Sequence, residues 1–428
     1  MILMLLTPLK LLLALWALLT GLAALLTLPG SVELLVLSVA ALLPRRASTS
    51  SAALPSEAPF RLAVIIPAHN EELSLPSCLQ SLLRAGRTGL GVDLHVDLYV
   101  IADNCSDGTA RVAQAEGAHV LLRNNELERG KGYALRYAMD SLQPLTHDCV
   151  LIVDADTEVA PDFLLAAAQA IRRGAPAIQA RYLTRNANES PRTRLMAFAL
   201  RAFNVVRPLG RENLGLSAGI FGNGFGLSRD TLDAVPYDAS SVVEDLEYHL
   251  ALVRSGRRVH FLNHTTVFGE MPVKGKGVET QRSRWEGGRL RMIILKTPGL
   301  LHDLLHGKLR SLEPLFELLL LPLAFHVLLL LVALASPLPG VRTLAAAGVV
   351  IVLLHLAATI SLADQPWSDL ATLGRAPFYI AWKILLIPSL LRSAKSEQAW
   401  VRTSRNAELA SEDATQPKPV PKDPNPRS

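Results

Sequence analysis

Long apolar runs near both ends of the chain limit what it can fold into more than any other feature. Near the N-terminus, residues 11–28 and 32–43 are mostly apolar and are separated by a Pro-Gly pair at Pro29. Near the C-terminus, residues 315–335 and 343–362 are each long enough to span a bilayer, since a helical span takes about 20 residues. Half of the 428 residues are hydrophobic and only 19% are charged, a high apolar share for a soluble enzyme. We therefore expect a chain that is partly embedded in a membrane, with a folded domain between its apolar ends.

The N-terminal run is either a cleaved signal peptide or an anchor that stays in the membrane. Only Lys10 precedes the run as a charged residue and no small-x-small cleavage site follows it directly, so we expect an anchor. The anchor forms one long helix or a tight helical hairpin, and the second run is short for a span of its own. Basic residues follow the first and last apolar regions, as expected of cytoplasmic flanks: Arg45, Arg46, Arg392 and Lys395.

The remaining C-terminal segments are less apolar. Residues 287–312 carry arginines and lysines among leucines and isoleucines, which is typical of an amphipathic helix that lies on a bilayer. Residues 378–391 contain Lys383 and are short, so they form a weak span or a second interfacial helix. The tail from residue 407, rich in Pro, Lys, Asp and Ser, is expected to be disordered.

The charge pattern and the cysteines exclude other classes of protein. The formal net charge is +5, but no Lys/Arg stripe interleaves with aromatic residues, so we expect no nucleic-acid partner. Cys78, Cys105 and Cys149 are the three cysteines, and no C-x-x-C occurs. This pattern predicts neither a disulfide framework nor a zinc site, and it indicates a reducing compartment.

Between the apolar ends, residues 61 to 262 have the pattern of an α/β domain. Three short apolar runs, at residues 62–67, 98–103 and 149–154, each end in polar residues and precede a helix-like stretch. Continuous apolar strands are typical of a buried parallel sheet. Because open sheets of this kind bind ligands at the carboxyl ends of their strands, we expect functional residues at these three ends.

Two acidic pairs lie in this domain. Asp154 and Asp156 end the third apolar run, and carboxylates one residue apart can share a divalent cation together with substrate phosphates. A solvated loop start is the alternative. Glu244 and Asp245 are adjacent, which predicts a raised pKa that suits a general base. The alternative is an acidic pair at the start of a helix, where the helix dipole favours negative charge.

The segment Gln281-Arg282-Ser283-Arg284-Trp285 has the pattern Q-x-x-R-W and precedes the C-terminal apolar region. Together with the two acidic pairs upstream, its order and spacing resemble the catalytic segments of membrane-bound family 2 glycosyltransferases, the group that holds cellulose, hyaluronan and poly-N-acetylglucosamine synthases. The resemblance covers about residues 60–290. It implies an α/β fold of the GT-A type, with a mixed, mostly parallel sheet and helices on both faces.

The resemblance assigns donor-binding residues to the first two strand ends. Pro67, Asn70 and Glu71 match the family's P-x-x-N-E element and are implied to line the uridine pocket. Asp103 matches the first Asp of D-D-x-S-x-D-G-T and is implied to contact the nucleotide base, while Asn104 stands where the family has its second Asp. A helix N-cap loop is the alternative for this second segment.

The resemblance also assigns residues to the diphosphate and the metal. Lys131 lies in a G-K-x-x-A-L segment and is implied to be near the diphosphate; a solvated lysine at a helix start is the alternative, and the spacing of a Walker site is absent. Asp154 is implied to lie beside the nucleotide sugar, and Asp156, with Asp154, to hold Mg²⁺ or Mn²⁺.

On the acceptor side, Asp245 corresponds to the family's general base, in a T-E-D motif where this chain has Val243 in place of Thr. Glu244 is implied to lie at the acceptor site. A glycine-containing segment is implied to shape the same site, or else forms a plain turn: Gly222, Asn223 and Gly224.

The Q-x-x-R-W segment completes the implied catalytic set. A helix would put Gln281 and Arg284 on neighbouring faces, because they are three residues apart. Trp285 offers a flat surface for stacking on a sugar, and Arg284 offers a bidentate donor for the departing diphosphate.

We expect an inverting glycosyltransferase that moves glucose or N-acetylglucosamine from a UDP-sugar to a growing polysaccharide or a lipid-linked acceptor. Its place would be a bacterial-type cytoplasmic membrane, with the catalytic domain facing the cytoplasm and membrane lipids and export or regulatory proteins as further partners. The expected segments are an anchor, a linker, the catalytic domain, interfacial helices, a transmembrane region and a cytoplasmic tail: 1–46, 47–60, 61–286, 287–312, 313–392 and 393–428.

Three alternatives stay open. The Q-x-x-R-W motif favours polymer synthesis, but the small number of spans leaves transfer of one sugar to a lipid open, as in ceramide glucosyltransferases. A transporter or membrane scaffold with a soluble insert would give no purpose to Asp154, Asp156 and Asp245. A catalytically inactive nucleotide-sugar sensor is disfavoured because every expected acidic residue is present.

Overall fold

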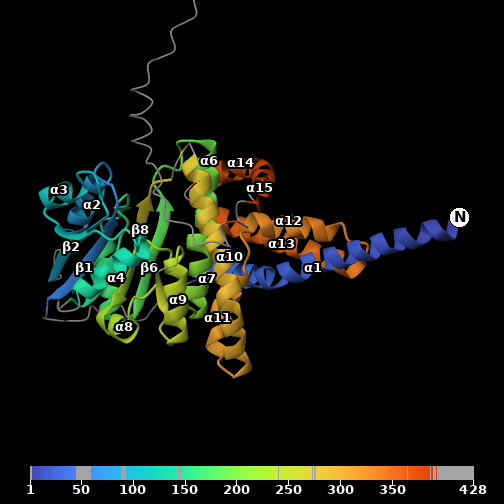
Figure 1. The fold of residues 1–428 in the computed structure, drawn as a ribbon, viewed down its shortest axis with the longest axis horizontal. Helices are drawn as coiled ribbons and strands as arrows, with labels where there is room; N and C mark the ends of the chain where they lie inside the picture. The colour runs from blue at the N-terminus through green and yellow to red at the C-terminus, as the bar shows by residue number, and fades with distance from the viewer. Residues whose placement is uncertain are drawn as a thin grey trace, which may run out of the picture.

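The computed structural model consists of an α/β domain and a group of long helices beside it (Figure 1). For residues 2–8 and 276–284 it describes the backbone only. The described residues are 2–44, 59–87, 93–142, 147–239, 241–271, 273, 276–363, 365–385, 387–388 and 392. The predicted linker falls largely, and the predicted C-terminal tail entirely, outside them.

One eight-stranded sheet forms the centre of the α/β domain, in the order β3-β2-β1-β4-β7-β6-β8-β5. The four strands β3, β2, β1 and β4 are parallel to one another, and β7 and β5 run antiparallel to their neighbours. This confirms the expected mixed, mostly parallel sheet. The strands are β1 (Phe60–Ala68), β2 (Leu94–Asp103), β3 (His119–Arg123), β4 (Cys149–Ile152), β5 (Glu158–Val159), β6 (Ala177–Thr184), β7 (Phe225–Ser228) and β8 (Val259–Gly269).

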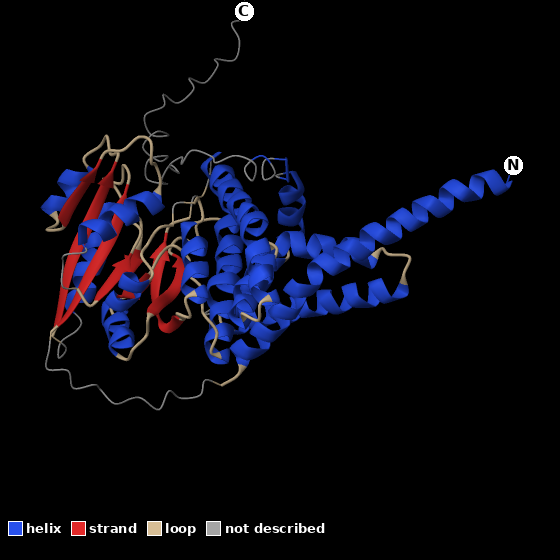
Figure 2. Ribbon diagram, turned by 60° about the horizontal axis from the view of Figure 1, so that its bottom comes forward, coloured by secondary structure: helices blue, strands red, loops and turns tan. Residues whose placement is uncertain are grey.

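Helices cover both faces of this sheet because the central strands are apolar on both sides (Figure 2). In β1, Leu62, Val64 and Ile66 pack into one core, whereas Ala63 and Ile65 pack into the other. The first core is closed by α2 (Leu75–Arg87), α3 (Thr109–Ala115) and α5 (Phe163–Arg172). The second is closed by α4 (Lys131–Leu142), α8 (Arg229–Ala234) and α9 (Glu244–Arg254).

The N-terminal segment predicted to be an anchor is one helix, α1 (Ile2–Leu42), and the hairpin alternative is wrong. Its first part extends away from the rest of the molecule in both views (Figures 1 and 2) and exposes leucines such as Leu11 and Leu12. Its second part packs against α7 (Arg207–Leu214), which follows α6 (Pro191–Arg201) and a short π-helical turn at Ala202–Val206.

Two described helices are long and apolar enough to cross a membrane: residues Leu9–Leu42 of α1, and α13 (Pro339–Ser361). The expected span at residues 315–335 is not a straight helix. It is divided into α11 (Leu312–Leu319) and α12 (Leu323–Leu334), and the helices on the two sides of the break bend by 80°. Pro322 explains the break, because proline lacks an N–H donor and disfavours helical backbone in the residue before it.

The Q-x-x-R-W segment lies in a helix of 30 residues, α10 (Lys276–Leu305), which runs across the predicted boundary between residues 286 and 287. A 3₁₀ turn at Leu309–Ser311 joins α10 to α11. The last described helices are α14 (Pro366–Leu373) and α15 (Ala376–Leu385). Lys383 of α15 forms an ion pair with Glu286 of α10, so α15 is bound to the helix that carries the Q-x-x-R-W segment.

Candidate active site

The parallel pairing brings three predicted segments to one edge of the sheet. In the register, Ala68 of β1 pairs with Ala102 of β2, and Ile65 of β1 pairs with Ile152 of β4. The residues that follow these strand ends are therefore neighbours in space. Pro67 is the penultimate residue of β1, Asp103 ends β2, and Asp154 lies two residues beyond the end of β4.

The loops after β1 and β2 are bound to each other. The Asn70 Oδ1 atom accepts a hydrogen bond of 2.7 Å from the backbone N–H of Ser106, and the backbone N–H of Glu71 donates to Thr109 Oγ1 at 2.8 Å. Asn70 has a φ of 55° and Asn104 a φ of 52°, left-handed conformations that asparagine adopts more readily than most residues. Asn70 and Glu71 thus shape the loop in which the donor site is predicted.

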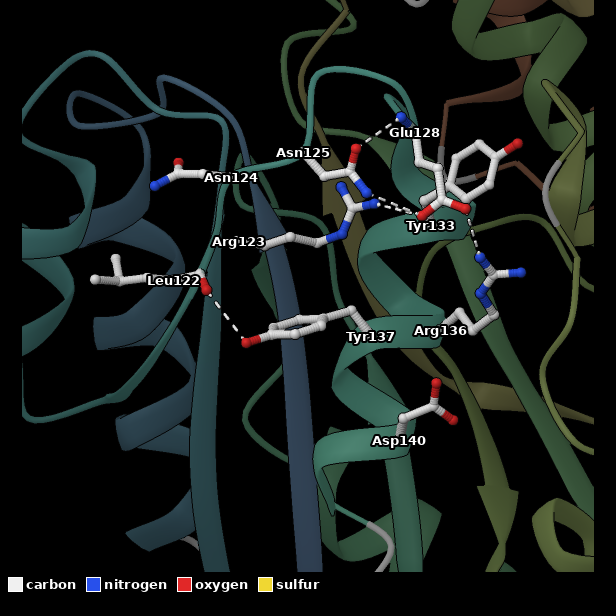
Figure 3. Close-up of a pocket in the computed structure, with 9 residues that line it drawn as sticks. All are labelled: Leu122, Arg123, Asn124, Asn125, Glu128, Tyr133, Arg136, Tyr137 and Asp140. Carbon is white, nitrogen blue, oxygen red and sulfur yellow. Dashed lines mark hydrogen bonds and ion pairs between the residues drawn. The ribbon is translucent and has the colours of Figure 1, made fainter.

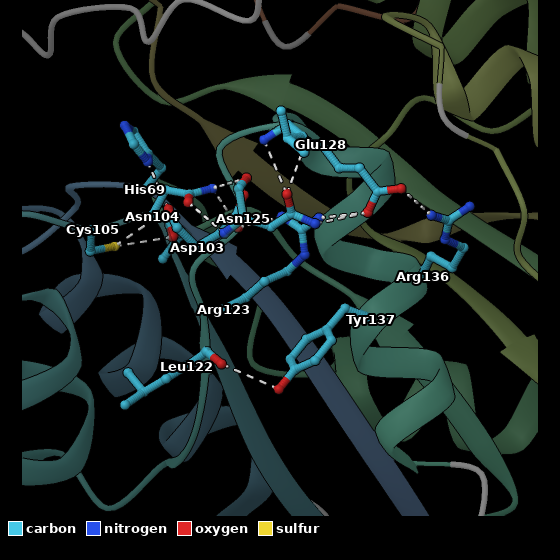
Figure 4. Close-up of polar contacts among 12 residues, drawn as sticks. His69, Asp103, Asn104, Cys105, Leu122, Arg123, Asn125, Glu128, Arg136 and Tyr137 are labelled. Atoms are coloured by element: carbon cyan, nitrogen blue, oxygen red, sulfur yellow. Dashed lines mark hydrogen bonds and ion pairs between the residues drawn. The ribbon is translucent and has the colours of Figure 1, made fainter.

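Asp103 is held by an arginine that the sequence reading missed. Its Oδ1 atom accepts hydrogen bonds from Arg123 Nη1 at 2.7 Å and from Asn104 Nδ2 at 3.0 Å (Figure 4). Burial raises the pKa of Asp103, although the bond and charge of Arg123 act in the opposite direction. Arg123 ends β3 directly opposite Asp103 in the register, so correct pairing of the two strands would have found it.

A cleft of about 430 Å³ lies between the end of β3 and α4 (Figure 3). Arg123 lines it and so connects it to Asp103. On its α4 side, Arg136 forms ion pairs with Glu128 at 3.0 Å and with Asp238 at 3.1 Å. The nine lining residues combine two tyrosines with charged and amide side chains: Leu122, Arg123, Asn124, Asn125, Glu128, Tyr133, Arg136, Tyr137 and Asp140.

Lys131 contacts two other predicted site residues, Asp154 and Gly222. Its Nζ atom donates to Asp154 Oδ1 and, at 2.5 Å, to the backbone carbonyl of Gly222. Burial works against the charged form of Lys131, but the carboxylates of Asp154, Glu244 and Asp245 outweigh burial and raise its pKa. Its side chain is only 21% exposed, so the alternative of a solvated lysine is wrong.

Gly222 brings the acceptor segment against the same residues. A Cβ atom added at this glycine would lie 3.4 Å from Asp245 Oδ2 and 3.6 Å from Lys131 Nζ. Its φ of 75° is left-handed, which favours glycine. Lys131, Asp154, Gly222 and Asp245, from four separate segments, therefore surround one small volume.

Glu244 and Asp245 are the first two residues of α9, as the helix-start alternative expects. They also lie close enough to Lys131 for their charges to act on it, so the alternative and a place in the site are both compatible with the structure. Both side chains are half-buried. Burial raises the pKa of both carboxyl groups; the charge of Asp245 adds to the rise at Glu244, whereas the backbone N–H of Leu246 and the charge of Lys131 limit it at Asp245. A carboxylate with a raised pKa can accept a proton near neutral pH.

The side chain of Asn223 holds the loop of the acidic pair. Its Oδ1 atom accepts a 3.1 Å bond from the backbone N–H of Asp154, and its Nδ2 atom donates to Thr157 Oγ1 at 2.8 Å. Gln179, which the sequence reading missed, donates to the carbonyl of Asn223 at 2.8 Å. Next to it, a Cβ atom at Gly224 would lie 2.5 Å from Val267 Cγ2, so this position has no room for a side chain. A role for residues 222–224 at an acceptor stays a prediction.

The donor set at residues 154–156 fits a hard divalent cation. The backbone N–H of Thr157 donates to the carbonyl of Asp154, which closes a turn that carries both half-buried carboxylates, Asp154 and Asp156. Among the described residues, no three His, Cys, Asp or Glu side chains form a complete cage for a metal. Mg²⁺ does not require one, because it takes one or two carboxylates and completes its shell with waters and substrate phosphates.

The Q-x-x-R-W residues are helical in α10, as the spacing predicted. The side chains of Gln281 and Arg284 lie outside the description, and Trp285 is 37% exposed. Three residues after Trp285, a Cβ atom at Gly288 would lie 3.0 Å from Val243 Cγ1. This helix therefore packs directly against the residue that precedes Glu244 and Asp245, and Val243 has a packing role at the position where the family has threonine.

Comparison with known proteins gives several relatives. The chain is 23% identical over 250 residues to "Probable glycosyltransferase YdaM" of Bacillus subtilis, which covers 55% of this chain and 56% of that protein. It is 27% identical over 182 residues to "Probable glucomannan 4-beta-mannosyltransferase 1" of Arabidopsis thaliana, which covers 41% of this chain and 32% of that protein. The chain thus spans about half or less of the length of these relatives.

Among solved structures, the mannosyltransferase PcManGT from Pyrobaculum calidifontis, in complex with GDP-Man and Mn²⁺, matches with 18% identity and a TM-score of 0.48. The match covers 88% of this chain and 97% of that chain. The family model described as "Glycosyltransferase like family 2" matches residues 59–288, more than half of the chain and the whole described α/β domain. The chain therefore belongs to glycosyltransferase-like family 2.

Proposed function

We propose that the protein is an inverting membrane glycosyltransferase that transfers a sugar from a UDP-sugar to an acceptor hydroxyl. The observation that carries this proposal is the meeting of Lys131, Asp154, Gly222 and Asp245 at the carboxyl edge of the sheet. It unites a cation, a carboxylate for the donor side, an open backbone position and a carboxylate with a raised pKa, which are the groups that such a transfer needs.

Asp245 is the general base of the proposed reaction. Its carboxylate takes the proton of the acceptor hydroxyl while the acceptor oxygen forms a bond to the anomeric carbon of the sugar. The bond between that carbon and the diphosphate oxygen breaks on the opposite side, and its electron pair leaves with the diphosphate. A single displacement of this kind inverts the anomeric carbon and gives a β-linkage from an α-linked donor.

The donor lies along the strand ends in this proposal. Pro67, Asn70 and Glu71 line the uridine pocket, and Asp103, fixed by Arg123, contacts the base. The following side chains meet the diphosphate and the sugar: Lys131, Asp154, Arg284 and Trp285. Gln281 completes this set from the same helix as Arg284.

Asp156, together with Asp154, would hold Mg²⁺ or Mn²⁺ in the proposed enzyme. When bound, the cation would offset the charge that develops on the diphosphate. Asn223 supports this role of the turn. Its side chain forms hydrogen bonds to the backbone of Asp154 and to Thr157, and so holds the turn that carries the two carboxylates.

We further propose that the acceptor is a polysaccharide or lipid-linked molecule at the cytoplasmic face of the membrane. In the part of the chain that the structure describes, two long apolar helices, and a third span if the bent pair counts as one, support attachment to a bilayer. So few spans favour an acceptor presented at the bilayer surface, and export of a polymer would need a second copy or a partner protein. Glu244 and residues 222–224 would face this acceptor.

The test is release of nucleoside diphosphate by purified membranes that carry the full chain. The panel contains UDP-sugars and GDP-mannose, each with Mg²⁺ or Mn²⁺, with and without lipid-linked acceptors. Release with one donor that is lost in Asp245→Asn and in EDTA supports the proposal and identifies the sugar. Binding of a donor without release under any of these conditions would instead support an inactive nucleotide-sugar sensor.

A further inference from the structure

A buried cluster of charged side chains joins the N-terminal helix to the helix that carries Asp245. Its members come from α1, α7, α11 and α9, which meet beside the sheet (Figure 1). None was singled out in the sequence, and none takes part in the proposed reaction. They are all at most 7% exposed: Glu33, Arg207, Arg211, His249 and Glu317.

Glu317 is at the centre of this cluster. Its Oε2 atom lies 2.9 Å from Arg211 Nη1 and 3.0 Å from His249 Nδ1. Arg289 of α10 donates a hydrogen bond to the backbone carbonyl of Glu317. Three cationic or basic side chains, from α7, α9 and α10, therefore converge on one residue of α11.

The second carboxylate of the cluster comes from the membrane helix. Glu33 Oε1 lies 2.7 Å from Arg211 Nη2 and 3.2 Å from Arg207 Nη2. Arg211 thus bridges Glu33 and Glu317 through its two Nη atoms. Removing one partner from such a buried group leaves an uncompensated charge, so the five side chains fix the relative positions of four helices.

Glu317 also adjoins the proposed active site. His249 is one helical turn after Asp245 in α9, and its Nε2 atom is hydrogen-bonded to Ser217 Oγ at 2.9 Å. A Cβ atom at Gly219 would lie 3.7 Å from Glu317 Oε1, so the carboxylate touches the loop that continues to Gly222. Glu317 therefore supports both segments that flank the proposed base.

The charge of Glu317 reaches Asp245 as well. Burial is the main cause that raises the pKa of Asp245, and the negative charge of Glu317 adds to it, while Lys131 of α4 lowers it. Glu244 is the other charged neighbour on α9, and its own pKa is raised together with that of Asp245. Arg289, on the packed helix α10, is directed to the carbonyl of Glu317.

We propose that Glu317 is a positioning residue for the transfer: through His249 it fixes the start of α9, and through its contact at Gly219 it fixes the loop that continues to Gly222. Glu33 extends this frame into the anchor by holding the same Arg211. The inference rests on the proposed function, because it takes Asp245 as the base. It assigns the membrane-associated helices α1 and α11 a part in catalysis besides attachment to the bilayer.

The test compares Glu317→Gln with Glu33→Gln in the full chain, using the pH dependence of kcat and the KM of the donor. Without the charge of Glu317, the pKa of Asp245 falls, so the acid limb of the profile moves to lower pH; the move is small, because burial is the main cause that raises this pKa. The weaker base and the looser helix lower kcat on the plateau by about tenfold, while the KM of the donor changes less than about twofold. In Glu33→Gln the limb stays in place, since Glu317 keeps its charge.

An unchanged plateau kcat in folded Glu317→Gln would overturn the inference. If Glu317→Gln does not accumulate as folded protein, Glu317→Asp takes its place, because it keeps the charge and withdraws the carboxylate by one methylene group. For Glu317→Asp we expect a lower kcat with no shift of the acid limb of the pH profile. A wild-type kcat in this variant would overturn the positioning role. Asp245→Asn separates the two hypotheses: if that variant stays active, the proposed base fails, whatever Glu317 does.

Discussion

Lys131 is the residue on which the proposed active site depends most directly. Its ammonium group holds Asp154 and the carbonyl of Gly222 and lies near Asp245. In the proposed enzyme, this position would let Lys131 exchange the carboxylate of Asp154 for the diphosphate of an arriving donor. A charge-assisted bond of this kind is worth about 1.5–3 kcal/mol, which corresponds to a change in affinity of about 10- to 150-fold.

We therefore expect Lys131→Ala to raise the KM of the donor by about tenfold or more. Lys131→Gln, which keeps a hydrogen-bond donor without the charge, should fall between that variant and the wild type. The measurement is donor saturation of nucleotide release, with Lys10→Ala as a control outside the site. An unchanged KM in Lys131→Ala would remove the lysine from the donor site.

The second prediction concerns the pH dependence of the reaction. Because burial raises the pKa of Asp245, the base is protonated at a higher pH than an ordinary aspartate. Activity should therefore be present above this raised pKa and be lost as the pH falls through it. Asp245→Asn should lower kcat by about 100-fold or more at every pH. A rate that stays level down to about pH 4, where ordinary aspartates titrate, would contradict the assignment.

At the residue scale, the sequence predicted several side chains of the proposed site but not the partners that hold these side chains in place. Asp103, Lys131, Asp154 and Asp245 could be named because each lies in a short recognisable segment. Arg123 could not, because its relation to Asp103 depends on which strands pair and in what register. Partners that are distant in the chain, such as those of Glu33 and Glu317, leave no local pattern at all.

At the scale of helices and strands, the strand ends were predictable because buried parallel strands read as continuous apolar runs. A continuous apolar run gave a wrong prediction at residues 315–335. Mean hydropathy is high there, but a single proline divides the expected span into two helices. For the second part of α1, the sequence likewise showed only an apolar run and not its packing against another helix. In the structure it packs against α7 so closely that a glycine is required at the crossing.

The third prediction tests this crossing. A Cβ atom at Gly210 of α7 would lie 2.2 Å from the backbone oxygen of Leu37, a clash with main chain that no side-chain rotation relieves. We expect Gly210→Ala to separate the helices and to reduce the yield and thermal stability of the protein in detergent. Gly21→Ala is the matched control, because a Cβ atom there meets nothing within 4 Å. Equal stability of the two variants would contradict the close packing of α1 on α7.

At the scale of the whole molecule, α1 shares buried ion pairs with α7, beside the α/β domain. Glu33 supplies a carboxylate to Arg207 and Arg211, both buried, so a domain without α1 would retain two buried cations with one partner fewer. Losing one partner of a buried ion pair costs about 3–5 kcal/mol. That is a large part of the total stability of a typical domain, about 5–15 kcal/mol.

The fourth prediction follows. Residues 59–428 expressed alone should give little folded, active protein, and co-expression of residues 1–44 as a separate peptide should restore it. The same peptide with Glu33→Gln is the control and should restore less. The measurement is nucleotide release together with the amount of detergent-soluble protein. An active, stable 59–428 fragment would show that α1 serves for attachment alone.

The long sequence separation between Glu33 and its partners also bears on how the protein is made. Arg207 follows Glu33 by 174 residues, so a ribosome working at about 5–20 residues per second completes it roughly 10–35 s later. Until then neither arginine that pairs with Glu33 in the folded structure has been made, and an unpaired carboxylate is stable only where water solvates it. The apolar residues before it, 9–28, already span about 30 Å as a helix. In the proposed membrane enzyme, the apolar residues before Glu33 would thus set the depth of α1 before the arginines that pair with Glu33 are made.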